Sequence, residues 1–409
     1  MRRGSTVNEA FLIDGVRTPV GRYGSALSSV RPDDLAALVI ESLIERTAVD
    51  PSAIDEVILG NANGAGEENR NVARMAWLLA GYPDTVPGMT VNRLCSSGLS
   101  AIILASHMIR SGAADLVIAG GVESMSRAPW VQAKPAAAFA KPGPVFDTSL
   151  GWRFANEKFT AGALSRDGKM TYSMPQTAEE VAEVHGISRA ESDRFALQSH
   201  ERSLAAIEAG HFAGEIVPVT VRHRQGETIM DTDEGPRAGT SLEALAGLRP
   251  IIKPGGVVTA GNSSTLNDGA SAILVASERA VKHFGLAARA RIVDGASAGV
   301  APEIMGVGPV ASTRKVLQRS GWEVADLQAV ELNEAFASQS LAVIKELGLD
   351  EGIVNRDGGA IALGHPLGSS GCRIVVTLLG RMEREQASRG LATLCVGVGQ
   401  GTSLLVERV

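Results

Sequence analysis

Two cysteines and one histidine stand in glycine-rich stretches of the chain, where small neighbouring side chains leave room for a substrate. Cys95 precedes an apolar helix pattern in VNRLCSSGLSAI, His365 lies within GGAIALGHPLGSSGC, and Cys395 lies within LCVGVGQG. A thiolate is a good nucleophile and a good thioester leaving group, so an acyl group can arrive from one thiol and leave to another. The three motifs together predict acyl transfer through a thioester.

Each of these residues also has a purely structural explanation. A free cysteine is most often a small buried residue. We interpret Cys372 in this way, and for Cys395 core packing is the alternative to a catalytic role. Cys95 at a helix N-terminus is expected to have a lowered pKa, because the helix dipole and the exposed N–H groups favour the thiolate. His365 is placed in a turn, where it can take the proton of that thiol and return it to a substrate oxygen.

Two polar segments add to the candidate chemistry. NEAFA at 333–337 places Asn333 at the end of a strand pattern, where its amide can orient a water or donate to an oxyanion. AGNSSTLNDGA at 260–270 contains small polar residues that suit the close approach of a slender ligand arm. A phosphate-binding loop is the alternative, but no lysine follows at the spacing that such a loop needs.

The composition argues against several classes of function. The 409 residues carry a net charge of −6, so no broad basic surface for nucleic acid is expected. No apolar run is long enough for a membrane span, and the start MRRGSTVNEAFLID is an extension rather than a secretory signal. Three cysteines without CxxC spacing favour neither a disulfide framework nor a metal site. We therefore expect no metal and a reducing, cytoplasmic location.

The strand and helix patterns alternate along the chain and then repeat. EAFLIDGV, AIDEVILGNAN and ADLVIAGGVES are typical of strands, and amphipathic or apolar helix patterns separate them, which predicts an α/β fold. Similar segments return in the same order about 272 to 280 residues later, which predicts two duplicated halves. The matched positions are Asp14 with Asp294, Asn61 with Asn333, and Cys95 with Gly368.

The material between the two halves has a different character. Residues 128–150 are rich in Pro, Ala and Lys and are typical of a loop. Two helices are predicted to follow, with capping-box signals at Thr177 and Glu180 and at Ser188 and Glu191. This segment is too long for an ordinary crossover. We therefore divide the chain into a first half (1–127 plus 254–287), an inserted loop domain (128–253) and a second half (288–409).

The blocks CSSG, NEAFA, GGAIALGHPLGSSGCR and LCVGVGQG together resemble those of the thiolases, which are acetyl-CoA acyltransferases. The resemblance runs from RTPVGRYG at 17–24 to the C-terminus. It implies an α/β thiolase fold with five layers, αβαβα, in which two duplicated βαβαβαββ halves each contribute a five-stranded mixed sheet and an inserted loop domain covers the site. It also implies a homo-oligomer, either a dimer or a dimer of dimers, that is, a homotetramer.

The same resemblance implies a role for each motif residue. Cys95 would be the nucleophile that accepts the acyl group, and His365 would activate it. Cys395 would be the acid and base at the enolate carbon of acetyl-CoA. One oxyanion hole would combine His365 with a water held by Asn333, and the other would use the backbone N–H groups of Cys95 and Gly397.

The resemblance further implies how CoA and acyl-CoA are bound. Ser264 would contact the pantetheine arm, Arg224 would lie near the adenosine phosphates, and Met174 and Met305 would border the acyl chain. The reaction would be a ping-pong exchange, 3-oxoacyl-CoA plus CoA giving acyl-CoA plus acetyl-CoA. CoA is then a substrate, and no metal or redox cofactor is expected because the thioester itself stabilises the enolate.

Departures from the common thiolase pattern bear on the substrate. GVGQG replaces a run of three glycines and a Met, and Ser173 precedes Met174 where biosynthetic acetoacetyl-CoA thiolases usually carry a His-Met pair. With GEENRNVARMA at 66–76, these features resemble the 3-oxoadipyl-CoA thiolases of aromatic catabolism, although the sequence singles out no basic residue for the distal carboxylate. Acetoacetyl-CoA and the long-chain 3-oxoacyl-CoA esters of fatty acid metabolism stay open as alternatives.

Two other functions also stay open at this point. A decarboxylating ketoacyl synthase shares the fold and the nucleophile but normally lacks a second cysteine like Cys395. A non-catalytic acyl-CoA or lipid carrier on the same scaffold should have lost a catalytic residue, whereas Cys95, Asn333, His365 and Cys395 are all present.

Overall fold

The first half of the chain folds in the predicted order of strands and helices. The computed structural model describes residues 8–135 and 137–409, so most of the predicted N-terminal extension, residues 1–7, lies outside the described range. Apart from the short β2 and the terminal α8, the half has the order βαβαβαββ. Its elements are β1 (Ala10–Arg17), β2 (Gly21–Arg22), α1 (Pro32–Thr47), β3 (Glu56–Gly60), α2 (Val72–Leu79), β4 (Gly88–Val91), α3 (Ser97–Ser111), β5 (Leu116–Ser124), β10 (Asn267–Ser277) and α8 (Glu278–Phe284).

The second half repeats this order with one strand missing among the described residues. Where β4 pairs with β3 in the first half, the second half has a single parallel bridge between Val330 and Val354. Asn355, with φ +46°, turns the chain away directly after that bridge, so no strand continues. The elements are β11 (Ala290–Gly299), α9 (Gly308–Ser320), β12 (Ala329–Leu332), α10 (Ala337–Leu347), α11 (Ala360–Leu363), α12 (Leu367–Glu385), β13 (Arg389–Val396) and β14 (Gln400–Arg408).

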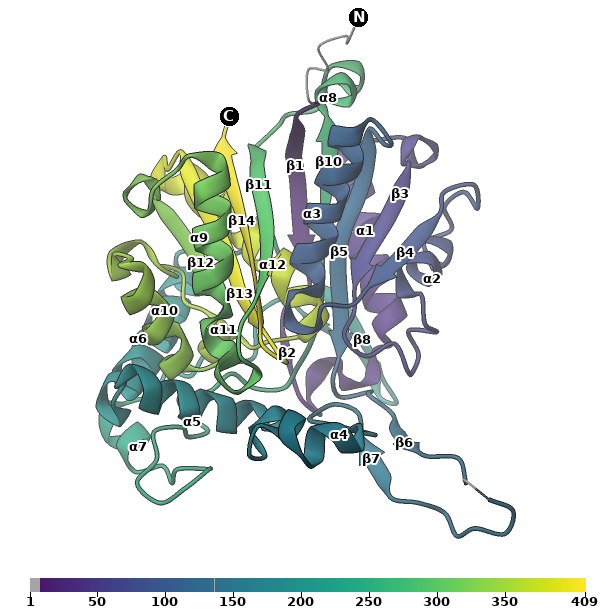
Figure 1. The fold of residues 1–409 in the computed structure, drawn as a ribbon. Coiled ribbons are helices and arrows are strands. Elements are labelled where there is room, and N and C mark those ends of the chain that lie inside the picture. The colour runs from purple at the N-terminus through teal and green to yellow at the C-terminus, as the bar shows by residue number, and fades with distance from the viewer. Residues whose placement is uncertain (1–7, 136) are drawn as a thin grey trace, which may run out of the picture.

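The expectation that each half contributes its own five-stranded sheet needs a correction. The described strands form one ten-stranded sheet in the order β12-β13-β14-β11-β1-β10-β5-β3-β4, with β2 beside β10 (Figure 1). The two halves join because β1 and β11 pair antiparallel at Phe11 with Arg291 and at Leu12 with Ala290. The second half contributes four of these described strands, since its counterpart of β4 is the single bridge at Val354.

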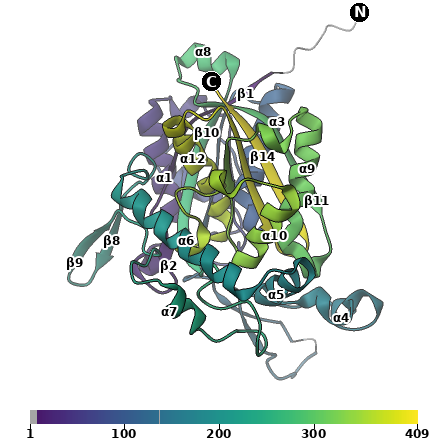
Figure 2. The same cartoon turned by 90° about the vertical axis from the view of Figure 1, so that its left-hand side faces the viewer.

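The helices form three layers around the two halves of the sheet, which confirms the predicted five-layer α/β architecture (Figures 1 and 2). Side chains of α1 and α2, such as Leu43 and Trp77, form a core with the first half. Side chains of α9 and α10 form another with the second half. Between the two halves, α3 and α12 are buried in a central core that includes Leu99 and Leu378.

Gly98 and Gly371 occupy matching positions of the repeat and allow α3 and α12 to cross at close range. A Cβ atom at Gly98 would lie 2.7 Å from the carbonyl oxygen of Gly368, and one at Gly371 would lie 2.2 Å from the backbone nitrogen of Leu99. Either side chain would force the two helices apart. The SSG motifs therefore bring the segment that carries Cys95 against the segment that follows His365.

Two aspartates at matching positions make the same contacts in β1 and β11. Asp14 and Asp294 each accept the N–H of the following residue, at 2.9 and 2.8 Å. Each also pairs with an arginine near the end of the next helix, Arg46 at 2.7 Å and Arg319 at 2.9 Å. The predicted duplication therefore extends to individual hydrogen bonds and ion pairs.

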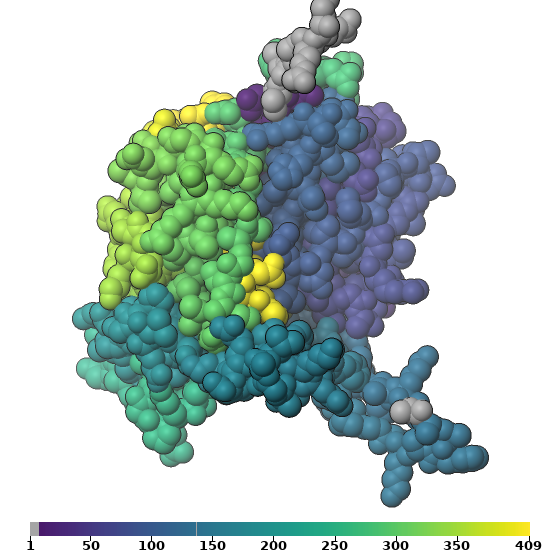
Figure 3. All heavy atoms as spheres, in the orientation of Figure 1, coloured from purple at the N-terminus to yellow at the C-terminus, as the bar shows by residue number. Residues whose placement is uncertain are grey.

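The segment between β5 and β10 covers one end of the sheet, where α4 and α5 run across it in Figure 1, and its hairpin β6–β7 projects from the body in Figure 3. The predicted capping box of Ser188 and Glu191 is confirmed. The one at Thr177 is wrong: the preceding helix starts at Met174 and is capped by Ser173. The elements are β6 (Trp130–Gln132), β7 (Val145–Asp147), α4 (Glu157–Thr160), α5 (Met174–His185), α6 (Arg189–Glu208), β8 (Val219–His223), β9 (Gly226–Met230) and α7 (Leu242–Ala246).

Candidate active site

A cavity of about 870 Å³ lies between this covering segment and the sheet. Six of the residues singled out by the sequence line it: Cys95, Met174, Ser264, Met305, His365 and Gly397. Asn333 and Cys395 are fully buried next to the lining, Asn333 against His365 and Cys395 in a cluster with Met305. Segments that are far apart in the sequence thus meet at one site.

Cys95 lies in the short 3₁₀ turn Leu94–Ser96 directly before α3 and is 9% exposed. Burial raises its pKa to about 11, and the backbone N–H groups of Gly397 and of Cys95 itself act in the opposite direction. The expected lowering of this pKa is therefore wrong for the protein without substrate, because loss of hydration outweighs the N–H groups. The two N–H groups that lower this pKa are also the donors that a bound carbonyl oxygen would meet.

His365 lies between α11 and α12, and its ring is oriented by a serine one turn away. The Nδ1 atom lies 2.7 Å from the Ser370 hydroxyl oxygen, and that hydroxyl donates to the carbonyl oxygen of Pro366 at 2.9 Å. Because the hydroxyl has one proton, Nδ1–H is the donor to Ser370, and Nε2 keeps its lone pair. Asn267 fixes the backbone of the same turn, since its Oδ1 accepts the His365 N–H at 2.9 Å.

The imidazole of His365 is neutral in these surroundings. Burial, and then the charge of Arg373, lower the pKa of His365 to about 3. A neutral imidazole beside a protonated thiol can act as a general base, with the proton moving as the sulfur attacks. A resting thiolate–imidazolium pair is disfavoured, because both pKa shifts oppose it.

Asn333 follows the last residue of β12 and faces the free nitrogen of the histidine. Its Nδ2 lies 3.4 Å from His365 Nε2, a long contact that adjusts easily. Its buried Oδ1 accepts no hydrogen bond from the described residues. The amide therefore has both a donor and an acceptor available beside Nε2.

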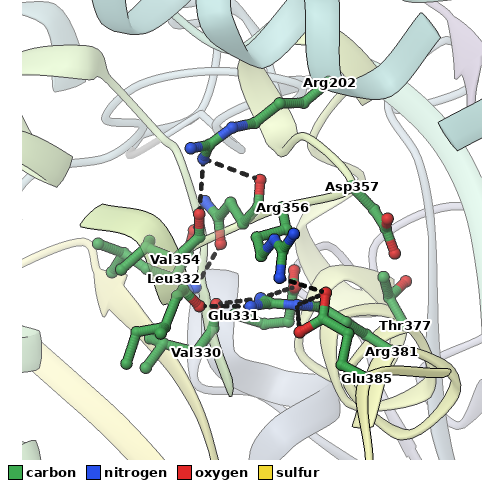
Figure 4. A network of polar contacts seen from close by, with 12 residues as sticks. Arg202, Val330, Glu331, Leu332, Val354, Arg356, Asp357, Thr377, Arg381 and Glu385 are labelled. Carbon is green, nitrogen blue, oxygen red and sulfur yellow. Dashed lines mark hydrogen bonds and ion pairs between the residues drawn. The ribbon is translucent and has the colours of Figure 1, made fainter. Parts of the chain in front are cut away.

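Among the described strands, β12 pairs with β13 on one edge only, and on its other edge side chains hold the backbone where a further strand would otherwise lie (Figure 4). Arg381 donates to the carbonyl oxygen of Val330 at 3.1 Å. Asn355 accepts the Leu332 N–H at 2.8 Å and donates to the Leu332 carbonyl at 2.7 Å. This network fixes the backbone directly before Asn333, and so fixes where its amide points.

Cys395 stands next to the last residue of β13 and has no exposed surface. Burial, and then the nearby charge of Cys95, raise its pKa, so the thiol is protonated at rest. Strand β13 contacts the turn Leu94–Ser96 that carries Cys95, so the two thiols lie in adjoining segments. Cys372, predicted to be a packing residue, is fully buried in the central core.

Glu123, at the end of β5, joins three segments of the site. Its Oε2 accepts the N–H groups of Ala62 at 2.9 Å and Gly368 at 2.8 Å. Burial raises its pKa to about 7, against the effect of these N–H groups. The carboxylate thereby ties the end of β3 and the turn after His365 to β5.

Three arginines border the cavity or the smaller one beside it. Arg22 and Arg153 line the main cavity, while Arg22 and Arg237 line a neighbouring cavity of about 370 Å³ that shares Ser263 with the first. None of the three forms an ion pair with a carboxylate in the part of the chain that the structure describes. Arg224, expected near the phosphates of CoA, lies in the exposed turn between β8 and β9 and lines neither cavity.

Within 8–135 and 137–409, no three or more His, Cys, Asp or Glu side chains are arranged to hold a metal ion. No helix among these residues is both long and apolar enough to cross a membrane.

Two family profiles match nearly the whole chain. The profile of the thiolase N-terminal domain covers residues 10–279, and that of the thiolase C-terminal domain covers residues 286–408. The chain belongs to the thiolase family. Its resemblance to the thiolases, based on four short blocks, is thereby confirmed over both halves.

Individual thiolases match the chain from end to end. A β-ketoadipyl-CoA thiolase of Pseudomonas aeruginosa is 55% identical over 98% of this chain and 99% of its own. A 3-oxoadipyl-CoA/3-oxo-5,6-dehydrosuberyl-CoA thiolase of Escherichia coli is 52% identical over 98% and 100%. The structure of human mitochondrial 3-ketoacyl-CoA thiolase in complex with CoA superposes with a TM-score of 0.90, at 36% identity and 98% coverage of each chain.

Sequence reasoning missed several residues that shape this thiolase site. Ser370 could have been found from the sequence. It lies five positions after His365, in the first turn of a helix, where its side chain can reach back toward the preceding turn. Glu123 belongs to the motif GGVES at 120–124, but this motif alone is too short to indicate a role for its carboxyl group. Arg153 and Arg237 lie in the inserted loop domain (128–253), where the sequence pattern does not indicate the direction of either side chain.

Proposed function

We propose that this protein cleaves 3-oxoacyl-CoA esters with CoA, reversibly, through an acyl group carried on Cys95. The observation that supports this best is that Cys95, His365 and Gly397 line one cavity, while the Cys395 thiol is buried in a cluster with Met305 of the same lining. A non-catalytic acyl-CoA carrier would not need these groups to lie close to one another. A ketoacyl synthase would not need a second thiol beside the first.

In the first half-reaction the nucleophile is made as it attacks. Nε2 of His365 takes the thiol proton while the sulfur of Cys95 bonds to C3 of the substrate. The oxygen of C3 becomes negative and is stabilised by the backbone N–H groups of Cys95 and Gly397, while His365 and a water held by Asn333 stabilise the enolate oxygen of acetyl-CoA. The C2–C3 bond then breaks, and Cys395 gives its proton to C2 of the departing acetyl-CoA enolate.

The second half-reaction returns both protons. The thiol of CoA gives its proton to the Cys395 thiolate and attacks the thioester on Cys95. The backbone N–H groups of Cys95 and Gly397 stabilise the oxyanions of the thioester carbonyls. Cys95 leaves as a thiolate and regains its proton from His365. The thioester stabilises the enolate, so we expect that no metal or redox cofactor takes part.

We place CoA along the two connected cavities. Ser264 lines the main cavity, where it would contact the pantetheine arm, with Met174 and Met305 closer to the acyl chain. Arg22 and Arg237 lack carboxylate partners among the described residues and would meet the phosphates, which arginine binds well. In this proposal Arg237 takes the role expected for Arg224.

We propose 3-oxoadipyl-CoA as the substrate in preference to acetoacetyl-CoA or long-chain esters. This is supported by the relatives from Pseudomonas aeruginosa and Escherichia coli, whose names specify 3-oxoadipyl substrates. It is also supported by an unpaired cation, Arg153, at a cavity that is otherwise largely apolar.

We further propose that the protein is a cytoplasmic homo-oligomer, a dimer or a dimer of dimers. The projecting hairpin β6–β7 supports this, because Trp130 is 75% and Val145 56% exposed. Large apolar side chains that are exposed in this way often mark a surface that another protein subunit covers. The two reduced thiols required by the mechanism support the location. Light scattering on the wild type and on Trp130→Ser checks the assembly; a monomeric wild type would contradict it.

The experiment for the function is thiolysis with free CoA. Acetoacetyl-CoA, 3-oxohexadecanoyl-CoA and 3-oxoadipyl-CoA are compared side by side, with Cys95→Ser as the inactive control. We expect cleavage by the wild type with 3-oxoadipyl-CoA preferred. No cleavage of any substrate, together with retained CoA binding, would favour the carrier instead.

A further inference from the structure

Arg153 is a half-buried cation without a protein counter-ion among the described residues. Its Nη1 donates to the Thr148 carbonyl at 3.3 Å, and its Nη2 donates to Asn63 Oδ1 at 3.4 Å. Both acceptors are neutral and both contacts are long. The guanidinium therefore lines the cavity with most of its charge uncompensated.

The cavity itself does not supply the missing negative charge. Among the described residues that line it, Glu123 alone carries a carboxylate. That carboxylate is already bound by the N–H groups of Ala62 and Gly368, and burial raises its pKa to about 7. An anion for Arg153 must therefore come with the ligand.

Hydrogen bonds place Arg153 at the nucleophile end of the cavity. Its partner Asn63 adjoins Ala62, whose carbonyl accepts Asn92 Nδ2 at 2.9 Å. Asn92 Oδ1 in turn accepts the N–H of Leu94 at 2.9 Å, and Leu94 immediately precedes Cys95. Arg22 differs, because it also lines the neighbouring cavity, which we assign to the phosphates of CoA.

The position matches the length of a short dicarboxylic chain. In 3-oxoadipyl-CoA the distal carboxylate carbon is three bonds from C3, the carbon that Cys95 attacks. Its partner must therefore lie close to Cys95, and beside an apolar wall for the two methylene groups. Trp152 and Met174 line the cavity and supply such a wall.

We propose that Arg153 binds the distal carboxylate of a dicarboxylic 3-oxoacyl chain and so determines which substrate this site prefers. This inference rests on the proposed thiolase function. A planar guanidinium receives a carboxylate through two parallel hydrogen bonds, which a lysine cannot do. A neutral chain of the same length would leave the cation uncompensated.

The test measures kcat/KM for thiolysis of 3-oxoadipyl-CoA and of 3-oxohexanoyl-CoA, which has the same six-carbon chain without the distal carboxylate. The wild type is compared with Arg153→Gln, Arg153→Lys, Arg22→Gln and the exposed control Arg224→Gln. We expect the ratio of the two kcat/KM values to fall about 100-fold in Arg153→Gln. Arg153→Lys should restore part of the ratio, and Arg224→Gln should leave it unchanged.

The other outcomes separate the inference from the function on which it rests. Equal losses on both substrates in Arg153→Gln would make Arg153 a structural residue, and a fall of the ratio in Arg22→Gln alone would move the carboxylate to Arg22. A wild type that cleaves both substrates equally well would overturn the inference while leaving thiolysis intact. A wild type that cleaves neither would overturn the proposed function, and the inference with it.

Discussion

The Nδ1 atom of His365 lies 2.7 Å from the hydroxyl oxygen of Ser370, and this hydroxyl donates a hydrogen bond to the carbonyl oxygen of Pro366. This short chain decides where the ring proton sits. It leaves the lone pair on Nε2, on the side of the ring that faces Asn333. The general base of the proposed mechanism is therefore oriented by Ser370, which is not among the residues that line the cavity.

Replacing this serine should affect the chemical step rather than substrate binding. In Ser370→Ala the tautomer with Nε2–H becomes accessible, so kcat should fall about 10-fold or more with little change in KM. Ser370→Thr keeps the hydroxyl and should recover most of the rate. Ser369→Ala is the matched control, because Ser369 pairs with Ser271 instead of His365. A larger effect of Ser369→Ala than of Ser370→Ala would contradict this role.

Cys395→Ser should separate carbon–carbon chemistry from acyl exchange. The hydroxyl is a much weaker acid than the thiol and protonates the enolate carbon poorly, so thiolysis of 3-oxoacyl-CoA should fall by at least about 100-fold. Exchange of an acyl group between CoA and Cys95 needs no proton at carbon, so part of it should remain even though Cys395 no longer takes the proton of CoA. Exchange of radiolabelled CoA into acetyl-CoA measures this directly. Equal loss of both activities would argue against the assigned role.

Glu123 gives the stability of the protein a pH dependence of defined sign. Its pKa rises from 4.5 to about 7 on burial, so between these values the folded state holds a proton that the unfolded state releases. Stability should therefore fall as pH rises through this window, by roughly 3 kcal/mol in total. Burial raises the pKa of Glu331 to about 7 as well, which adds a fall of the same sign.

The variant Glu123→Gln removes its own part of that dependence. The thermal unfolding midpoint of the wild type should decrease from pH 5 to pH 7.5 more steeply than that of Glu123→Gln. The slope left in the variant reports Glu331 and the rest of the protein. Parallel curves for the two proteins would show that the Glu123 carboxyl does not titrate in this range.

Val398 is strained in the turn between β13 and β14. It has φ +62°, a region that β-branched residues rarely adopt, and it directly follows Gly397. Val398→Asn should stabilise the fold by about 1 kcal/mol, since asparagine tolerates this conformation. Thermal unfolding checks the result, with Ile229→Asn in the exposed strand β9 as the control. Destabilisation by Val398→Asn would mean that packing of the valine outweighs its backbone strain.

The repeat made most of the fold predictable. Because strand and helix patterns recur at a nearly constant offset, the positions of Asp14 and Asp294, or of Gly98 and Gly371, could be matched before any coordinates were known. The boundary of α5 was wrong because a serine four residues before Thr177, Ser173, offers the same cap. The fifth strand predicted for the second half is absent from the described residues because the chain turns at Asn355, which has a positive φ. The alternation of apolar and polar residues did not indicate this turn.

The site was predictable where residue type implies chemistry. Cys95, His365 and Cys395 carry reactive atoms in glycine-rich motifs, and the fold brings them together. Burial reversed the predicted pKa of Cys95, because hydration depends on tertiary packing that the helix dipole argument ignores. The arginines were missed since their importance lies in lacking a partner, a property that exists only in three dimensions.

The central claim is that Cys95 carries the acyl group, and mass spectrometry of the enzyme tests it most directly. The wild type, Cys95→Ser and Cys395→Ser are each incubated with acetyl-CoA and then freed of CoA and digested. We predict an added acetyl group on the peptide that contains Cys95 in the wild type and in Cys395→Ser, and none at that position in Cys95→Ser. Acetylation of another residue, or turnover of 3-oxoadipyl-CoA by Cys95→Ser at the wild-type rate, would contradict the account.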